Sequence, residues 1–221
     1  MIACIFDLDG VLVDTAVYHY QAWKKLANSL GFDFSQAQNE QLKGVNRMSS
    51  LEKILGWGGV SKTTAEKEEL AALKNTWYVD MISRMSASEV LPGSVELLQQ
   101  LKDRGIKIAL GSASKNSGLI LERTNLAHFF DAIVDGNAVT SSKPDPEVFL
   151  KGAEMLHTAA EDCIVFEDAA AGVEAAIAAK MAVVGIGEAE NLPGADKVIR
   201  DLSAITVEEL ISLSRQKTGK E

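Results

Sequence analysis

Short runs of mainly apolar residues recur along this chain, and they limit its possible folds more than any other feature. Each run is three to five residues long, and together they occupy residues 2–6, 106–110, 132–134, 163–166 and 182–186. A short run without regular polar alternation is typical of a strand that is buried on both faces. Strands of this kind belong mainly to parallel sheets, because helices then cover both sides.

Helical patterns separate these runs. Pro92 and Gly93 precede one such pattern, Pro146 precedes another, and residues 169–180 are rich in alanine, which is a strong helix former. Strands that alternate with helices of this length predict an α/β fold, a Rossmann-like parallel sheet with helices on both faces. A last helix is expected after Glu209.

Residues 15–87 have a different pattern, which predicts a separate helical cap. Apolar stripes recur there at helical spacing, first at Ala16, Tyr20, Trp23, Ala27 and Leu30, and later at Leu70, Leu73, Trp77 and Met81. Thr63 and Glu66 form a capping-box pattern before the second stripe. Because about seventy residues are too many for an ordinary loop, we expect a cap domain of residues 15–87 inserted into an α/β core domain of residues 1–14 and 88–221.

Composition and charge restrict the partners of the chain. Hydrophobic residues make up 47% and charged residues 24% of the 221 positions, an ordinary globular range that excludes collagen-like and disordered classes. With 22 basic and 31 acidic residues the net charge is −9, so neither nucleic acid nor an anionic membrane is expected as a partner.

The sequence shows no targeting or membrane segment. No stretch is long and apolar enough for a membrane span, and the first apolar run is too short for a signal peptide. Cys4 and Cys163 both lie in apolar runs, which predicts buried, reduced thiols in the cytoplasm. No long exposed apolar stripe calls for a second chain, so we expect a monomer.

The strongest functional signal is the segment DLDGVLVDT, residues 7–15, directly after the first predicted strand. In parallel sheets, ligands bind beyond the carboxyl ends of the strands, which is where Asp7 and Asp9 would lie. The alternative is a polar strand-to-helix turn in which Asp9 and Gly10 are turn residues.

A second pair of acidic residues, Glu167 and Asp168, follows another predicted strand. If both pairs meet at one edge of the sheet, several like charges lie close together, which is unfavourable without a cation. A hard divalent cation removes this repulsion, and a ligand set made only of oxygen atoms suits Mg²⁺. We therefore expect a Mg²⁺ site. This expectation weakens the alternative interpretation, in which residues 7–15 are only a polar strand-to-helix turn.

Two further segments supply groups that can bind phosphate. The segment GSASKN, residues 111–116, offers two hydroxyls, an ammonium and an amide just before an expected helix start, where backbone N–H groups can face an anion. Lys143 lies in a turn that contains Pro144 and Pro146. A single lysine in a turn is usually solvated, so Lys143 gains its importance from the other signals.

An Asp-x-Asp-Gly segment, a serine, a lysine and a Glu-Asp pair, each after a strand and in this order, resemble the haloacid dehalogenase superfamily. The resemblance spans the whole chain, including the cap. It implies phosphoryl transfer rather than dehalogenation, because metal-free dehalogenases of the superfamily lack the second aspartate, which is Asp9 here.

The resemblance and the charges together predict a role for each group. Asp7 is expected to attack phosphorus and form an aspartyl-phosphate. Lys143 and the Ser112 hydroxyl would hold phosphoryl oxygens, Asp9 would act as general acid and base, and Thr15 keeps the family position at the hinge into the cap. The expected ligands of Mg²⁺ are Asp7, Asp9 through its backbone carbonyl, Glu167 and Asp168.

Several segments carry a closer resemblance. DLDGVLVDTAVYHYQAW, LKGVNRMSSLEKIL, ALKNTWY and GSASKN resemble the β-phosphoglucomutase subfamily. This resemblance implies interconversion of β-D-glucose 1-phosphate and D-glucose 6-phosphate through bound β-glucose 1,6-bisphosphate. A small-molecule sugar phosphate is then the expected partner.

A mutase needs a second cationic set for the phosphate that is not reacting. Arg47 is expected to bind it, while His19 and Lys74 contact the site from the cap and His19 steers Asp9 as the cap moves. Taken singly, His19 is more often structural, and Arg47 and Lys74 are more often surface cations. The expected substrate-binding residues are Trp23, Lys43, Gly44, Val45, Arg47, Ser50, Lys74, Ala113, Ser114, Lys115 and Asn116.

Two other functions stay open. A phosphatase of the same fold, acting on a hexose phosphate or phosphoglycolate, would use the same core with water as acceptor, but Arg47 would then have little purpose. A non-catalytic sugar-phosphate sensor would be expected to lose Asp7 or Asp9, and both are present. Residues 56–59 look like a loop that the family pattern does not place, and Val13 stands where a polar residue is often expected.

Overall fold

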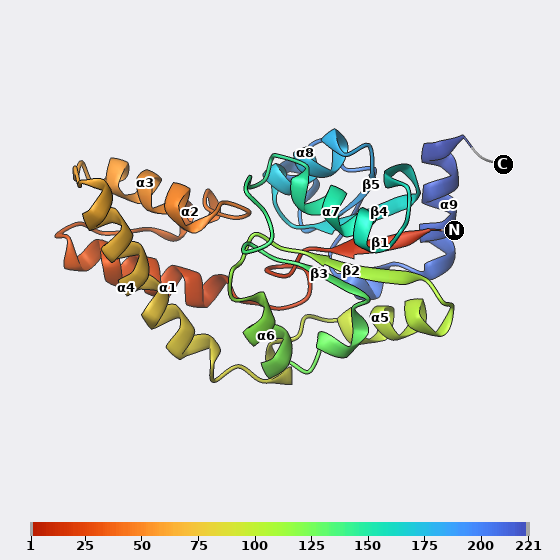
Figure 1. The fold of residues 1–221 in the computed structure, drawn as a ribbon, viewed down its shortest axis with the longest axis horizontal. Helices are drawn as coiled ribbons and strands as arrows, with labels where there is room; N and C mark the ends of the chain where they lie inside the picture. The colour runs from red at the N-terminus through yellow and green to blue at the C-terminus, as the bar shows by residue number, and fades with distance from the viewer. Residues whose placement is uncertain (1, 220–221) are drawn as a thin grey trace.

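A computed structural model describes residues 2–219 of the chain. Within that range the strands form one parallel sheet in the order β3-β2-β1-β4-β5-β6 (Figure 1). The bounds are β1 (Ala3–Phe6), β2 (Lys107–Gly111), β3 (Ala132–Val134), β4 (Cys163–Glu167), β5 (Ala182–Ile186) and β6 (Lys197–Ile199). The predicted parallel α/β fold is confirmed, whereas β6, which is short and begins with a lysine, was not predicted.

The central strand β1 brings the expected site residues to one edge. Phe6, the last residue of β1, lies opposite Leu110 on one side and Phe166 on the other. The rings of Phe6 and Phe166 stack with their centroids 4.3 Å apart. The residues that follow these three strands therefore begin at the same level, as the sequence predicted.

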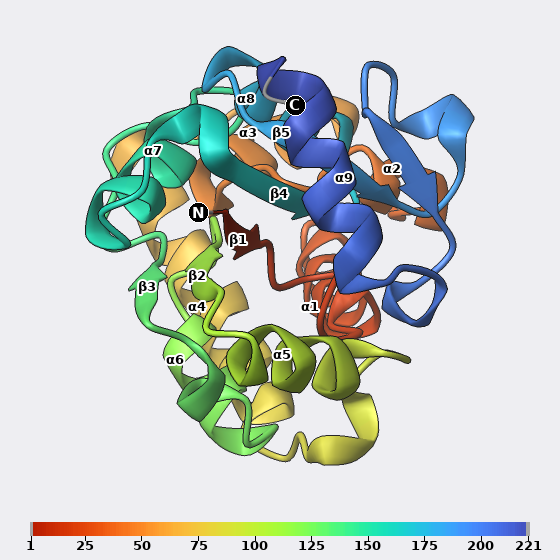
Figure 2. The ribbon, with the colours of Figure 1, turned by 90° about the vertical axis from the view of Figure 1, so that its right-hand side faces the viewer.

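Helices cover both faces of the sheet (Figure 2). On one face, α5 (Ser94–Asp103), α6 (Ser117–Arg123) and α9 (Val207–Thr218) pack with the side chains of Cys4 and Phe6. On the other, α7 (Glu147–Met155) and α8 (Ala170–Ala178) pack with Ala3 and Ile5. None of the described helices is long and apolar enough to cross a membrane.

The segment predicted as a cap forms a helical unit with a small apolar core of its own, which includes Trp23, Phe34 and Ile54 (Figure 1). Its helices are α1 (Ala16–Ser29), α2 (Gln36–Glu40), α3 (Arg47–Trp57) and α4 (Thr64–Ile82). The Thr63 hydroxyl accepts from Glu66 N, and the Glu66 carboxylate accepts from Thr63 N, so the predicted capping box is present.

The buried face of α4 differs from the expected apolar stripe. Leu73 is 42% exposed, while Lys74 is only 2% exposed and Tyr78 only 1%. Leu70 and Trp77 are partly buried at the edge of the cap core. The apolar stripe was wrong at Leu73 and missed the most deeply buried side chains, because α4 directs a lysine and a tyrosine toward the interior, where they meet α1 and the start of the hinge.

Two chain segments connect the cap to the α/β core, and they pair with each other. Asp14 N donates to Glu89 O at 3.0 Å, Leu91 N donates to Leu12 O at 2.9 Å, and Val13 forms a β-bridge with Val90. Val13 is fully buried, which accounts for an apolar residue at this position.

The expected loop at residues 56–59 is in part helix, since α3 continues to Trp57. The Trp57 ring is 6.2 Å from that of Phe34, centroid to centroid. Gly58 ends the helix beneath Phe32, where an added Cβ would come within 2.4 Å of the ring. Close packing thus accounts for Gly58, whereas Gly56 and Gly59 have open space around them and Gly59 has a positive φ of +63°.

Candidate active site

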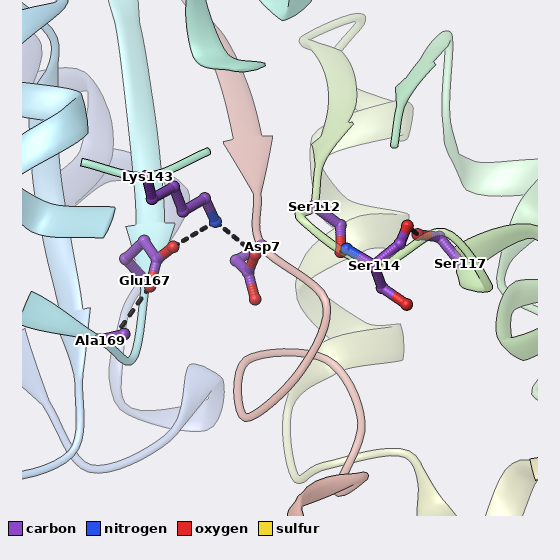
Figure 3. Close-up of polar contacts among 7 residues, drawn as sticks. All are labelled: Asp7, Ser112, Ser114, Ser117, Lys143, Glu167 and Ala169. Atoms are coloured by element: carbon purple, nitrogen blue, oxygen red, sulfur yellow. Dashed lines mark hydrogen bonds and ion pairs between the residues drawn. The ribbon is translucent and has the colours of Figure 1, made fainter. Parts of the chain in front are cut away.

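A buried ion-pair network lies where β1 and β4 end (Figure 3). Lys143, from the segment between β3 and α7, donates from Nζ to Asp7 Oδ1 at 2.5 Å and also to Glu167 Oε1. Its side chain is 1% exposed. Burial alone would lower the pKa of Lys143, but the charges of Asp7 and Glu167 outweigh it and raise the pKa. The lysine is therefore a fixed cation at the sheet edge.

Three carboxylates form a compact group beside this lysine. Asp7, Glu167 and Asp168 each offer an oxygen, and these atoms lie within 4.8 Å of one another. Burial raises the pKa of Glu167 to about 8, with the charges of Asp7 and Asp168 adding to the shift. Burial and the charge of Asp7 likewise raise the pKa of Asp168 to about 7.

Two glycines allow the carboxylates to approach so closely. A Cβ on Gly10, where φ is +83°, would lie 2.2 Å from Asp168 Oδ2, and a Cβ on Gly172 would lie 1.9 Å from Glu167 Oε1. Packed carboxylates with raised pKa values and only oxygen donors fit a hard divalent cation such as Mg²⁺, which would stabilise their charged forms.

The segment after β2 places hydroxyls on the other side of Asp7 (Figure 3). Ser112 is fully buried, and its hydroxyl oxygen accepts from Ser114 N at 3.1 Å. The Ser114 hydroxyl accepts from Asn116 N at 3.2 Å, so each serine folds the turn and keeps its own proton to donate. Ala113, Ser114 and Asn116 are partly buried, while Lys115 is exposed.

Asp9 lies apart from the carboxylate group and faces the hinge. Its Oδ1 accepts a hydrogen bond from the Thr15 hydroxyl, and Thr15 is fully buried. Burial and the charge of Asp7 raise the pKa of Asp9 to about 6, although the Thr15 hydrogen bond opposes both effects. A carboxyl with such a pKa can give and accept a proton near neutral pH.

The cap contributes a buried cation close to Asp9. Lys74 Nζ lies 3.1 Å from His19 Nδ1, and it sits over the rings of Trp23 and Tyr78 at 4.4 and 4.5 Å from their centroids. Burial, with the charge of Arg47, lowers the pKa of Lys74 to about 7. Burial and the charges of Lys74 and Arg47 lower the pKa of His19 well below its usual value, so His19 is neutral.

The loop before α3 carries the other expected cap residues. Lys43 Nζ lies 3.4 Å from Asp168 Oδ2 and 2.9 Å from Glu40 Oε2. Gly44 has a positive φ of +71°, and a Cβ added there would make an ordinary contact with the Ala169 Cβ at 3.4 Å. The neighbouring Val45 and Arg47 are partly buried, and the buried Ser50 donates from Oγ to Val45 O at 3.4 Å.

Two hydrogen bonds join the cap to the α/β core through residues that the sequence did not single out as a pair. Asn46 Nδ2 donates to Ser142 Oγ at 2.9 Å, and Asn116 Nδ2 donates to Asn75 Oδ1 at 3.0 Å. Each bond spans long separations in the chain, so no local pattern could have indicated it. Tyr78 was also missed, since an aromatic residue in a helix is more often part of the apolar core.

Comparisons with known proteins agree with this geometry. The sequence profile described as haloacid dehalogenase-like hydrolase matches residues 4–186. The chain is 46% identical to β-phosphoglucomutase of Bacillus subtilis over 94% of this chain and 93% of that protein. It is 33% identical to a phosphorylated carbohydrates phosphatase of Thermotoga maritima over 80% of each chain.

The structural comparison extends the similarity to the cap. The crystal structure of β-phosphoglucomutase from Clostridium difficile matches with a TM-score of 0.95 and 41% identity, over 99% of this chain and 100% of that one. The profile covers well over half of the sequence, and the Bacillus subtilis protein exceeds 30% identity along nearly its full length. The chain therefore belongs to the haloacid dehalogenase-like hydrolase family.

Proposed function

We propose that this enzyme interconverts β-D-glucose 1-phosphate and D-glucose 6-phosphate through an aspartyl-phosphate. The observation that carries the proposal is a second, unpaired cationic set on the cap: among the described residues, neither Arg47 nor Lys74 has a carboxylate within ion-pair distance. Buried or half-buried cations without an anionic partner are unfavourable unless an anion binds there. The similarity to β-phosphoglucomutases supports the same reaction.

Asp7 is the proposed nucleophile. Its carboxylate oxygen attacks phosphorus, the bond between phosphorus and the sugar oxygen breaks, and the aspartyl-phosphate forms. Lys143 lies against this carboxylate and would stabilise negative charge on the transferring group, and the Ser112 hydroxyl can donate to another of its oxygens. Asp7, Glu167, Asp168 and the backbone carbonyl of Asp9 would hold Mg²⁺, which when bound neutralises charge on the phosphoryl oxygens.

Asp9 is the proposed general acid and base. It would protonate the sugar oxygen as the phosphorus–oxygen bond breaks, and it would take the proton of the sugar hydroxyl that attacks the aspartyl-phosphate in the other half of the cycle. Its pKa of about 6 suits both tasks. Thr15 at the hinge holds the Asp9 carboxylate when it is turned away from Asp7.

The cap binds the phosphate that is not reacting. Arg47 offers a planar donor pair for that phosphate, and Lys74 adds a second charge beside it. In the reaction, β-glucose 1,6-bisphosphate would form at Asp7. It would then reverse its orientation within the site and present its other phosphate to the same carboxylate. The proposed pocket includes, besides these two cations, Trp23, Lys43, Gly44, Val45, Ser50, Ala113, Ser114, Lys115 and Asn116.

We infer that residues 15–87 act as a mobile cap on the core formed by residues 1–14 and 88–221. Lys43, Asn46 and Asn75 reach from the cap to the core, so the domains meet around the site. Closure would keep water from the aspartyl-phosphate, and opening would let the intermediate reverse. A single chain supplies every group named here, so the enzyme is proposed to work as a monomer.

A coupled assay tests the proposal. The enzyme is supplied with Mg²⁺, β-glucose 1-phosphate and a trace of β-glucose 1,6-bisphosphate, and glucose 6-phosphate and free phosphate are followed together. We expect rapid formation of glucose 6-phosphate with little free phosphate. Release of one phosphate per substrate without isomerisation would reject the mutase.

The second candidate is a sugar-phosphate phosphatase. It is favoured by the 33% identity to the Thermotoga maritima phosphatase, and it would use Asp7, Asp9 and Lys143 in the same way with water as the final acceptor. An Arg47→Ala variant separates the two functions. A phosphatase that binds one phosphate at Asp7 would keep most of its rate, whereas the mutase would lose isomerisation by about 10-fold or more.

A further inference from the structure

The Tyr78 hydroxyl is the one buried side-chain polar atom without a hydrogen-bond partner in residues 2–219. Tyr78 lies on α4 and is 1% exposed. Buried polar atoms without a partner are rare in folded proteins, and each of them calls for a physical reason. A buried tyrosine usually finds a partner for its hydroxyl, so this orphan marks a place where an acceptor is missing or has moved.

The ring of Tyr78 is held firmly, so the hydroxyl has a fixed direction. The centroid of the Tyr78 ring lies 4.2 Å from that of the His19 ring, and the Lys74 ammonium lies over the face of the Tyr78 ring, 4.5 Å from its centroid. The Thr15 hydroxyl is close enough to act on the Tyr78 hydroxyl as a hydrogen-bonding neighbour, although no hydrogen bond of good geometry joins them, and the charges of Asp9 and Arg47 act on it as well. The hydroxyl therefore points to the meeting place of the hinge, the carboxylate of Asp9 and the cap cation.

Counting donors and acceptors identifies the missing partner. Thr15 has one hydroxyl proton, which it donates to Asp9 Oδ1, so the Thr15 oxygen keeps lone pairs that can accept. The Asp9 carboxylate can accept further hydrogen bonds through both oxygens. Lys74 and His19 are already engaged with each other. The Tyr78 hydroxyl, a donor without an acceptor, thus faces Thr15 and Asp9, whose oxygens can accept a further hydrogen bond.

We propose that Tyr78 is a positioning residue for Asp9, whose hydroxyl donates to the Thr15–Asp9 pair and fixes the orientation of the Asp9 carboxyl during the reaction. This role rests on the proposed function, in which Asp9 transfers protons at the sugar oxygen. A small shift of α4 toward the hinge as the cap moves would bring the hydroxyl to its acceptor. Tyr78 touches neither the sugar nor the transferring group in this role.

The test is a Tyr78→Phe variant, which keeps the ring and removes only the hydroxyl. Tyr20→Phe is the matched control, because Tyr20 lies on the cap and its hydroxyl accepts from Lys24 Nζ at 3.1 Å, outside the site. For isomerisation of β-glucose 1-phosphate we expect kcat to fall about 10-fold in Tyr78→Phe, with KM within about twofold of the parent, since positioned acid–base groups contribute about 10²–10⁴-fold. Tyr20→Phe should match the parent in both.

A second readout isolates the proton-transfer step. Acetyl phosphate is a reactive phosphoryl donor for a carboxylate such as that of Asp7, and its leaving group, acetate, needs no proton. Tyr78→Phe should therefore form the aspartyl-phosphate from acetyl phosphate within about twofold of the parent rate. In an Asp9→Asn background, single-turnover transfer from the sugar phosphate should be no slower when Tyr78→Phe is added, because the two residues act in one unit.

Other results would overturn the proposal. Equal slowing with both phosphoryl donors would assign Tyr78 a structural role, and a rise in KM alone would assign its hydroxyl to the sugar phosphate beside Arg47. An unchanged kcat would leave the hydroxyl without a role in catalysis. If the parent chain itself forms no aspartyl-phosphate from acetyl phosphate, the proposed function fails first, and the role of Tyr78 fails with it.

Discussion

Lys74 Nζ lies 3.1 Å from His19 Nδ1, and this contact joins two groups that would normally repel each other if both were protonated. Burial and neighbouring cations lower the pKa of both, to about 7 for Lys74 and well below the usual value for His19. His19 therefore accepts from the lysine as a neutral ring. The Lys74 ammonium is thus surrounded inside the cap by the aromatic faces of Trp23 and Tyr78 and not by a carboxylate.

Replacing this lysine should stabilise the chain while impairing the reaction. The folded-state pKa of Lys74, about 7, lies below the value of 10.5 for an unburied lysine, so between these pH values the unfolded chain binds more protons and the free energy of unfolding rises with pH. The cost of the buried charge is therefore largest below pH 7. Lys74→Met should raise the free energy of unfolding by about 1–3 kcal/mol near pH 6, and by less near pH 9.5.

Urea unfolding at the two pH values measures the effect, and the coupled assay should show isomerisation falling about 10-fold or more. A variant that is less stable than the parent near pH 6, or equally shifted at both pH values, would contradict this account of the buried charge.

Asp7→Asn should abolish the covalent intermediate while the fold is kept. The amide is nearly the same size and can stay beside Lys143, which retains Glu167 as its other partner. We expect isomerisation to drop by at least about 10³-fold, since the covalent route is lost. Intact-protein mass spectrometry after exposure to acetyl phosphate should show no phosphorylated species. Normal turnover by this variant would reject Asp7 as the nucleophile.

Gly10→Ala should disturb the carboxylate group specifically. Gly10 has φ +83°, and its added Cβ would meet Asp168 Oδ2 at 2.2 Å, whereas Gly31, at φ +90°, has open space around it. Both substitutions should lower the free energy of unfolding by about 1 kcal/mol through backbone strain. Only Gly10→Ala should also weaken Mg²⁺ binding in calorimetric titration, by about 10-fold or more. Equal Mg²⁺ affinity in the two variants would refute the packing argument.

Asn75→Ala should loosen the contact between cap and core. The variant removes the 3.0 Å hydrogen bond from Asn116 Nδ2, and a bond of this kind contributes about 1 kcal/mol, or about fivefold in the closing equilibrium. We expect more free phosphate per glucose 6-phosphate in the coupled assay, because water reaches the aspartyl-phosphate more often.

Thr76→Ala is the control for that experiment. Thr76 is exposed on the same helix, and its hydroxyl donates to Ala72 O, so this hydrogen bond stays within α4. Its product ratio should equal that of the parent. If Asn75→Ala shows the same ratio as Thr76→Ala, the Asn75–Asn116 bond does not control closure.

Much of the site follows from local sequence because parallel strands end at one edge. The apolar runs locate the ends of β1 and β4, so the sequence alone predicts that Asp7 and Glu167 lie close together, and the register of the two strands agrees. Cys4 and Cys163 are buried as free thiols, as expected from their apolar surroundings.

The cap was harder to interpret, for a physical reason. Apolar periodicity selects the most hydrophobic face of a helix, but α4 buries Lys74 and Tyr78 and leaves Leu73 exposed. If this face serves the proposed reaction, its departure from the pattern that packing alone would favour is expected. The Asn46–Ser142 bond joins residues 96 positions apart, and a single sequence holds no signal for such a pairing.

The paired connections between cap and core determine how the cap can travel. A single connecting segment would let the helical unit rotate and shift in many directions. The two connecting segments pair with each other around Val13 and Val90, and this pairing restricts how the unit can move relative to the core. The opening and closing proposed for the cap would thereby be confined largely to one axis. Lys43, which reaches Asp168 across the boundary between cap and core, would then return to the same carboxylate each time the cap closed.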